Sequence, residues 1–396
     1  MEINIRDRTA IVGVGATPYY RRGESYPRTL YELMGEAIIA AAQDAGISVR
    51  DIDGFAYYSS ANSGYAEAMD TATIMETLGI PELTFTGALT NGGGGSAGAI
   101  GLAAAAILTG DARYVVTVMA LQQFRQRLGG SFAALAPTAE TSFIQPAGLV
   151  GPGNLVSLLA RRHMHKYGTR REAFAEIAIT SRTNALNRPT ALMRTPLSKE
   201  EYFRARMISD PLCLYDFCLE SDGAVAVITT SADRAKDLKQ KPVYVMGAAH
   251  GGSSSWGRAF MGMQMPDDVF TSSGNRPVAK RLYSKAGVSP RDIDVALIYD
   301  HFSPMVLMQL EDYGFCDIGE GGPFVESGAI RFKDGTIPVN THGGQLSEAY
   351  IIGMTHILEA VEQLRGTAIN QVPDAEIALV TGGPAPLPVS GLILRR

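Results

Sequence analysis

A short internal repeat constrains the fold of this chain more than any other feature of its sequence. Residues 45–53 read AGISVRDID, and residues 286–294 read AGVSPRDID. A second pair follows in the same order, because residues 91–95 (NGGGG) correspond to residues 340–344 (NTHGG) at a similar offset. Matching segments in the same order and at similar offsets indicate two copies of one structural unit.

Each copy of this unit alternates short apolar runs with segments of helical spacing. In the first copy we expect strands over residues 9–16, 52–58, 83–89, 114–119 and 224–230, and helices over residues 30–45, 66–78 and 91–106. The second copy ends in an apolar strand over residues 377–381. Strands that alternate with helices predict an α/β fold, with a parallel sheet whose faces are covered by helices.

The pattern also suggests where the chain divides. Residues 121–206 are irregular and rich in Arg, Pro and aromatic residues, residues 234–241 form a charged linker, and Trp256 lies in a Gly/Ser-rich segment typical of a loop. We therefore predict an N-terminal lobe over residues 1–235, which includes a loop subdomain at about 121–206, and a C-terminal lobe over residues 242–396. A pseudo-twofold axis would relate the two lobes.

The composition narrows the classes of partner and location. The 396 residues are 46% apolar and carry a net charge of −5, and scattered Lys and Arg argue against a nucleic-acid partner. The N-terminus lacks the apolar core of a signal peptide, and the longest apolar run, residues 97–109, is too short to span a bilayer. Cys213, Cys218 and Cys316 form no Cys-x-x-Cys pair, and we interpret the first two as core thiols. We expect a reduced, cytoplasmic protein with no membrane partner.

Residues 339–350 (VNTHGGQLSEAY) carry the most chemical information. Paired glycines allow a tight turn and a close approach of ligand to the backbone. A helix that begins behind the turn presents free N–H groups and a positive dipole end, which favour a developing anion. Tyr350 would lie in the first turns of that helix. A plain strand–turn–helix connection explains this stretch alone equally well, but the similar residues 91–96 favour a duplicated active-site floor.

Two other motifs near the first glycine run are weaker. Residues 93–98 fit G-x-G-x-x-G, but no acidic residue ends a strand about 20 residues later, as dinucleotide binding requires. Residues 94–98 also fit the G-x-S-x-G elbow of a hydrolase, with Ser96 as nucleophile and Asp294 and His342 as its partners. The repeat of two lobes does not fit a hydrolase sheet.

Taken together, these segments resemble the thiolase superfamily, specifically its sterol-carrier-protein branch, over nearly the whole chain. Thiolases carry a nucleophilic Cys in an Asn-x-x-Cys-x-Ser pattern, and Gly94 stands at that position. In the segment that holds an oxyanion-hole water, here residues 299–302 (YDHF), Tyr299 stands at the oxyanion position. Tyr350 stands at the catalytic His of the Gly-His-Pro segment, and residues 380–383 (VTGG) lack the second Cys.

This resemblance implies a five-layered αβαβα body and, without a thiol at Gly94, excludes a covalent acyl-enzyme. The residues resemble those of the thiolase-like lipid-transfer-protein aldolases of steroid side-chain degradation. Such enzymes cleave a β-hydroxyacyl-CoA, such as one carried by a steroid or bile-acid side chain, to a ketone and a short acyl-CoA such as propionyl-CoA. They need no metal and no cofactor beyond the CoA of the substrate.

The resemblance also implies partners. The related aldolases work with a small zinc-finger/OB-fold protein, in an α2β2 complex around a homodimer that would bury an edge strand. Arg161, Arg162 and Lys166 lie where related enzymes hold the nucleotide end of CoA, although exposed basic residues on a helix are more often simply solvated. The chain is thus expected to be a carbon–carbon lyase. The alternative is a non-catalytic or acyl-transferring subunit of a complex.

Retro-aldol chemistry assigns roles to the two tyrosines. The proton of the β-hydroxyl must be removed while the Cα–Cβ bond breaks, and the resulting thioester enolate needs donors at oxygen and a proton at carbon. We expect Tyr350 to act as the base and Tyr299 as the acid. Because a free phenol has a pKa of about 10, the basic tyrosine would have to be activated as a phenolate.

The neighbours of the tyrosines are the predicted binding residues. We expect nearby N–H dipoles, or a neighbour such as His342 or His301, to activate the basic phenol, and Asp300 to contribute to substrate binding. Backbone N–H groups around Gly94 and Gly344 are expected to hold the enolate oxygen. A scaffold without activity has no need of these segments, so their presence favours an enzyme.

Overall fold

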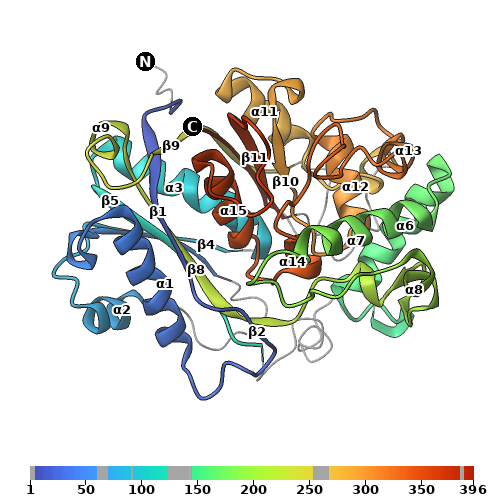
Figure 1. Cartoon of the computed structure of the whole chain (residues 1–396), viewed down its shortest axis with the longest axis horizontal. Helices are drawn as coiled ribbons and strands as arrows, with labels where there is room; N and C mark the ends of the chain where they lie inside the picture. Colours follow the sequence, from blue (N-terminus) through green and yellow to red (C-terminus); the bar gives the residue numbers. More distant parts are fainter. Residues whose placement is uncertain are drawn as a thin grey trace.

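The two lobes are joined through one sheet (Figure 1). The computed structural model describes residues 5–59, 70–90, 92–123, 142, 145–252, 267–383 and 388–396, so Asn91 and Trp256 lie outside the described residues. The order of the strands is β4-β3-β5-β8-β1 in the N-terminal half and β9-β12-β11-β10 in the C-terminal half. The pairing of β1 with β9 joins the halves, with Ala10 opposite Tyr244.

The strands of this sheet have the following bounds: β1 Thr9–Ala16, β3 Gly54–Ser59, β4 Phe85–Thr90, β5 Tyr114–Leu121, β8 Ser221–Ser231, β9 Val243–Gly251, β10 Val295–Leu297, β11 Ile377–Gly382 and β12 Val389–Arg395. The short β2, Tyr20–Arg21, pairs with β8 off this path. A separate small sheet consists of β6, Met207–Ser209, and β7, Leu212–Cys213.

The prediction of a parallel sheet was wrong for part of the sheet. The β3 strand runs parallel to β4 and β5, and β10 runs parallel to β11, whereas the other neighbours are antiparallel. For β12 the reason is the short connection of residues 383–388. A parallel pair needs a crossover of a dozen or more residues, so β12 can only return antiparallel to β11.

The main helices form three layers around the two halves of the sheet. They are α1 Leu30–Ala45, α2 Thr71–Leu78, α3 Ser96–Thr109, α11 Arg276–Ala286, α12 Ser303–Asp312 and α15 Met354–Arg365. The α1 helix packs on β1, β5 and β8, and α11 packs on β9 and β12. The α3 and α15 helices contact strands of both halves and form the central layer, as Figure 1 shows. The αβαβα order that the resemblance implied is therefore confirmed.

The two copies of the repeated segment also form equivalent hydrogen bonds. The Asp53 carboxylate accepts from the backbone N–H groups of Arg113 and Tyr114, at 2.9 and 2.8 Å, where β5 begins. In the second lobe, Asp294 accepts from the N–H groups of residues 376–377, at 2.8 and 2.9 Å, where β11 begins. The last aspartate of each repeat thus fixes the start of the equivalent strand.

The second repeated segment occupies equivalent places as well. In the first lobe the glycine run Gly92–Gly95 comes just after β4, and in the second Asn340 follows Val339, which forms a single parallel bridge with Ala296 of β10. Val339 therefore takes the place beside β10 that β4 takes beside β3. Both glycine runs consequently begin at the same edge of their half-sheets.

The helix predicted to carry Tyr350 does not reach it. One short turn, α14 Gly344–Ser347, follows the paired glycines, and the long helix α15 begins only at Met354. Ile352 and Gly353 have φ angles of 44° and 84°, in the left-handed region, which a right-handed helix cannot include. Tyr350 therefore lies in an irregular segment between two helices.

The described part of the loop subdomain is more regular than predicted. It contains α6 Pro152–Tyr167, α7 Arg171–Ala185 and α8 Lys199–Arg204. Proline at the first position of α6 and the left-handed Gly168 behind it are ordinary helix boundaries, but Arg and His residues interrupt the apolar stripe. The α7 helix packs on α12, α13 (Gly321–Glu326) and α14. In the described part of the chain, no helix has the length and apolarity needed to cross a membrane.

The repeated aspartates give a test of the fold. In Asp53→Ala and Asp294→Ala, two backbone N–H groups lose their acceptor at the start of a strand. We expect each variant to lose about 1–3 kcal/mol of unfolding free energy, measured by urea denaturation. Asp233→Ala is the control, because the Asp233 side chain is 95% exposed. Unchanged urea midpoints for both variants would show that these hydrogen bonds do not hold the strands.

Candidate active site

Two tyrosine hydroxyls meet inside the protein. Tyr299 follows β10 after Ile298, and Tyr350 lies between α14 and α15. Their Oη atoms are 3.3 Å apart and share a buried hydrogen bond. Only 2% of Tyr299 and 8% of Tyr350 is exposed, so the pair is shielded from bulk water. The structure brings these two predicted residues into direct contact.

The backbone of Tyr299 is held on both sides. Its N–H donates to Thr381 Oγ1 at 2.8 Å, and its carbonyl accepts from Gln309 Nε2 at 2.7 Å. The Thr381 hydroxyl in turn donates to Gln309 Oε1 at 2.6 Å. This closed set of hydrogen bonds links β11 and α12 to Tyr299 and fixes the direction in which its ring points.

The ring of Tyr299 fills space that two glycines leave open. A Cβ atom at Gly93 would lie 2.1 Å from Cζ of Tyr299, and one at Gly353 would lie 3.0 Å from Cδ2. Gly93 precedes α3 and Gly353 precedes α15, so the ring lies between the first turns of the two central helices. A residue with a side chain at Gly93 would displace the phenol.

Tyr350 is positioned by a residue of the other lobe. Its N–H donates to Ser221 Oγ at 2.8 Å, and the Ser221 hydroxyl donates to the carbonyl of Tyr350 at 3.1 Å. The segment just before Ser221 continues this contact, because the N–H of Cys218 donates to the carbonyl of His301 at 3.0 Å. The start of β8 thus forms one wall of the tyrosine site.

Gly94 has no room for a side chain. A Cβ atom there would lie 1.7 Å from the carbonyl oxygen of Pro388, and a Cβ atom at Gly383 would lie 3.1 Å from the Gly94 backbone. The position that the resemblance assigns to the thiolase nucleophile is therefore closed by backbone atoms. Gly93 and Gly94, just before the first turn of α3, thus form a floor without side chains beside the ring of Tyr299.

The carboxylate of Asp300 forms its hydrogen bonds inside the protein. It is 1% exposed and accepts from the backbone N–H groups of Gln345 and Leu346, at 2.9 and 3.3 Å. Its carboxylate also lies 3.1 Å from Nε2 of His356. A Cβ atom at Gly344 would lie 2.0 Å from this carboxylate. The N–H groups of α14 that we expected to face substrate are therefore bonded to Asp300.

The two predicted histidines are neutral at neutral pH. Burial lowers the pKa of His301 to about 3, and its ring centroid lies 5.1 Å from that of Tyr299. Burial also lowers the pKa of His342 well below its usual value, and neighbouring His356 lowers it further. The His342 nitrogens make no hydrogen bond within the described residues. Neither imidazole therefore carries a positive charge with which it could favour a phenolate.

Tyr350 is therefore a protonated phenol at neutral pH. Burial raises its pKa above the usual value, the neighbouring Cys218 raises it further, and the hydrogen bond with Tyr299 partly offsets this rise. Burial also raises the pKa of the Cys218 thiol. Cys218 is thus a neighbour of the phenol pair as well as a packed thiol, and its spacing in the sequence gives no sign of this contact.

Gln345 is a further polar residue that the sequence did not single out. It is fully buried, and its Oε1 accepts from the N–H of Gly353 at 2.9 Å. Its Nε2 has no hydrogen-bond partner among the residues that the structure describes. Leaving a buried donor unpaired costs about 1–3 kcal/mol. The only signal in the sequence is the place of Gln345 directly behind the paired glycines.

A buried ionic cluster anchors the segment that carries Tyr350. The guanidinium of Arg188 pairs with Glu348, with Glu359 at 2.7 Å and with Glu362 at 3.0 Å. Burial raises the pKa of Glu348, and it raises that of Glu362 to about 7. His342 Nε2 lies 3.8 Å from Glu348 Oε2. The cluster joins this segment to α15, and His342 belongs to it more closely than to the phenols.

The residues of the alternative hydrolase do not come together. The Ser96 hydroxyl donates to the carbonyl of Gly93 at 3.1 Å. Asp294 caps the start of β11, and His342 lies beside Glu348. Within the described ranges, no three His, Cys, Asp or Glu side chains gather as a metal site would require.

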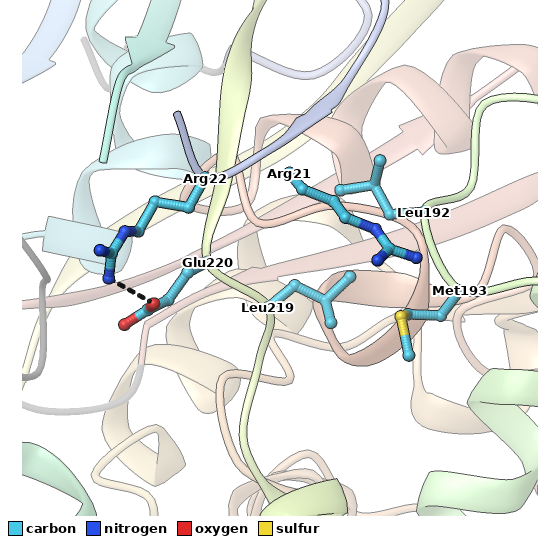
Figure 2. Close-up of a pocket in the computed structure, with 6 residues that line it drawn as sticks. All are labelled: Arg21, Arg22, Leu192, Met193, Leu219 and Glu220. Atoms are coloured by element: carbon cyan, nitrogen blue, oxygen red, sulfur yellow. Dashed lines mark hydrogen bonds and ion pairs between the residues drawn. The ribbon is translucent and has the colours of Figure 1, made fainter. Parts of the chain in front are cut away.

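Figure 2 shows the residues that line a surface pocket of about 420 Å³. It is lined by Arg21, Arg22, Leu192, Met193, Leu219 and Glu220, and Arg22 pairs with Glu220 at 3.2 Å. The backbone N–H groups of Leu192 and Leu219 bond to the carbonyls of Glu348 and Gln345. The pocket therefore borders the outer side of α14.

Elsewhere, Arg161, predicted near CoA, pairs with Asp210.

Solved structures support the architecture. A structure named Ltp2-ChsH2(DUF35) aldolase matches with a TM-score of 0.90 and 36% identity, over 99% of both chains. Human mitochondrial 3-ketoacyl-CoA thiolase matches with a TM-score of 0.73 and 16% identity over 99% of both chains, which shows the shared fold.

Sequence comparisons agree with this match. A 17-hydroxy-3-oxo-4-pregnene-20-carboxyl-CoA lyase of Mycobacterium tuberculosis is 39% identical over 98% of this chain and 99% of its own length. A steroid side-chain-cleaving aldolase of Thermomonospora curvata is 38% identical over 97% of both. The family profile "Thiolase, N-terminal domain" matches residues 9–233, and "Thiolase C-terminal domain-like" matches residues 252–388. The chain therefore belongs to the thiolase superfamily.

Proposed function

We propose that this protein is a carbon–carbon lyase that cleaves a β-hydroxyacyl-CoA by a retro-aldol reaction, without a covalent intermediate. The observation that carries the proposal is the contact of two buried phenols, Tyr299 and Tyr350, above a floor where Gly94 leaves no place for a nucleophile. Relatives of nearly equal length that are named as a lyase and an aldolase support the same reaction class.

The reaction balances without an oxidant or a second substrate. The β-hydroxyl loses its proton, its oxygen forms a ketone with Cβ, and the Cα–Cβ bond breaks. The electron pair of that bond forms a thioester enolate, which takes a proton at Cα and leaves as a short acyl-CoA. One proton thus moves from the hydroxyl of the substrate to the carbon of the product.

Two neutral phenols in contact provide a path for this proton. Tyr350 accepts the hydroxyl proton while its own proton passes to Tyr299, and Tyr299 delivers its proton to Cα. Burial opposes a stable phenolate, since it raises the pKa of Tyr350. A relay across the 3.3 Å contact avoids a separate charged tyrosine and replaces the resting phenolate that we expected from the sequence.

The glycine floor suits the thioester end of the substrate. The α3 helix begins at Ser96, no described side chain caps its first N–H groups, and the helix dipole there favours negative charge. The glycines at positions 93 and 94 allow a close approach to this end. We place the enolate oxygen here, while Asp300 holds the N–H groups at the start of α14.

The substrate class and partners are part of the proposal. The names of the two relatives favour a CoA ester on a steroid or bile-acid side chain, with propionyl-CoA as a product when the cleaved unit has three carbons. The matching aldolase structure is named for two components, and the second, a DUF35 protein, supports a protein partner for this chain. The zinc-finger/OB-fold character of that partner and the α2β2 complex follow only from the family resemblance. The strand β4 ends the sheet and is suited to pair with a second copy. Free cysteines fit a cytoplasmic enzyme.

Replacement of each tyrosine by phenylalanine tests the relay. Tyr299→Phe and Tyr350→Phe keep the packed ring and remove one hydroxyl, so we expect kcat to fall by about 10²–10⁴-fold in each. Ketone and acyl-CoA release from a steroid β-hydroxyacyl-CoA is the measurement. Tyr283→Phe is the matched control, because its hydroxyl bonds to the carbonyl of Tyr313. Full turnover in both site variants would rule the tyrosines out.

The dependence of kcat/KM on pH separates a neutral relay from a phenolate base. Burial raises the pKa of Tyr350 above its usual value of about 10, so the Tyr350 hydroxyl stays protonated to higher pH than a free phenol. We expect kcat/KM to stay level from about pH 7.5 to 9.5 and to fall only above that range. A tenfold rise for each pH unit in this range would instead indicate a phenolate base.

A further inference from the structure

The side-chain amide of Gln345 has a fixed orientation and an unused donor. The N–H of Gly353 points at this amide from 2.9 Å, and only the oxygen of the amide can accept that hydrogen bond. The NH₂ group must therefore point the other way. It is fully buried and has no acceptor among the described residues, so the amide offers two hydrogens to a group that these residues do not supply.

The amide lies beside the reaction centre. Its partner Gly353 packs on the ring of Tyr299, because a Cβ atom at Gly353 would lie 3.0 Å from Cδ2 and Cε2. The same Cβ atom would lie 2.9 Å from Oγ of Ser96, the first residue of α3. Gln345, the ring of Tyr299 and the first turn of α3 therefore all contact Gly353.

The backbone of Gln345 is fixed by both of the segments that hold the tyrosines. Its N–H donates to Asp300, the residue after Tyr299, at 2.9 Å. Its carbonyl accepts from the N–H of Leu219, near the β8 residue that holds Tyr350, at 3.0 Å. The residue is thus anchored at three points, two in its backbone and one at its side-chain oxygen, so its amide is preorganised to stabilise a charge without reorganising.

We propose that Gln345 is a further catalytic residue, whose side-chain amide donates a hydrogen bond to the enolate oxygen of the departing thioester. This inference rests on the proposed retro-aldol reaction. The negative charge forms on that oxygen as the Cα–Cβ bond breaks, so the hydrogen bond is stronger in the transition state than with the bound thioester.

Other donors near the phenols are less suited to this role. Asp300 occupies the N–H groups of Gln345 and Leu346. The pKa of His301 near 3 leaves a neutral ring with a single N–H. The Gln345 amide carries a proton donor at any pH and acts together with the end of α3, since an enolate oxygen accepts more than one hydrogen bond.

Two variants separate the donor from the rest of the side chain. Gln345→Glu keeps an acceptor for the N–H of Gly353 but removes the NH₂ group, and Gln345→Met keeps the length of the side chain and removes both functions. We expect kcat for cleavage to fall by about 10²–10³-fold in each, with KM changed only a few-fold. Gln363→Met is the matched control, because Gln363 is a buried glutamine whose amide donates to Thr341, Glu359 and Asn370.

A second readout follows the enolate alone. In D₂O the wild-type enzyme should exchange the Cα hydrogens of propionyl-CoA, which requires the enolate but no carbon–carbon cleavage. We expect both Gln345 variants to lose this exchange together with cleavage, whereas the Gln363 control retains both. Wild-type values of kcat and of exchange in folded Gln345 variants would overturn the role of Gln345. A wild-type enzyme that neither cleaves nor exchanges would instead overturn the proposed function.

A measurement on the wild-type protein tests the same inference even if the Gln345 variants fail to fold. The infrared carbonyl band of propionyl-CoA labelled with ¹³C at its carbonyl reports hydrogen bonds to the thioester oxygen. We expect this band to shift to lower frequency in the complex than in water. A bound thioester whose carbonyl band lies at or above its frequency in water would overturn the inference.

Discussion

The hydrogen bond between Tyr299 and Tyr350 is the interaction around which the site is built. Two hydroxyls removed from water need partners, and here each supplies the other. The ring of Tyr299 reaches this position because Gly93 and Gly353 have no side chains. A separate contact, with the carbonyl oxygen of Pro388, leaves no room for a nucleophilic side chain at position 94. These two contacts underlie the proposal of acid–base chemistry in place of acyl transfer.

The duplicated fold explains how the site is held. The central helices α3 and α15 contact both halves of the sheet, and their first turns approach Tyr299 from opposite lobes. Tyr350 comes from the C-terminal lobe but bonds through its backbone to Ser221 of the N-terminal lobe. Because the contact between the phenols depends on both lobes, a shift between them would change the distance along which the proton moves.

The sequence predicted the parts of this arrangement that follow from local periodicity and repetition. The strand Thr9–Ala16 and the helix Leu30–Ala45 appear as expected. The two copies of the AGISVRDID segment make equivalent hydrogen bonds through Asp53 and Asp294. The resemblance to thiolases brought Tyr299 and Tyr350 forward as a pair, although no local pattern shows that their side chains touch.

Long-range contacts account for what the sequence did not show. Tyr350 lies outside a helix because the left-handed Ile352 interrupts it, and β-branched residues rarely adopt that conformation. His342 turns toward the cluster of Arg188, and its charge state follows from burial that spacing does not reveal. The role of Gln345 depends on its bond to Gly353 and on the lack of an acceptor for its NH₂ group among the described residues. Such features arise only when distant segments pack together.

The central claim is that a carbon–carbon bond breaks between two neutral phenols, with no acyl group on the protein. Rapid-quench mass spectrometry of the intact chain during turnover of a steroid β-hydroxyacyl-CoA, with its products quantified in the same samples, tests this most directly. We expect ketone and short acyl-CoA in equal amounts and a protein of unchanged mass at every time point. An acyl adduct on the chain, or release of free CoA without ketone, would contradict the claim.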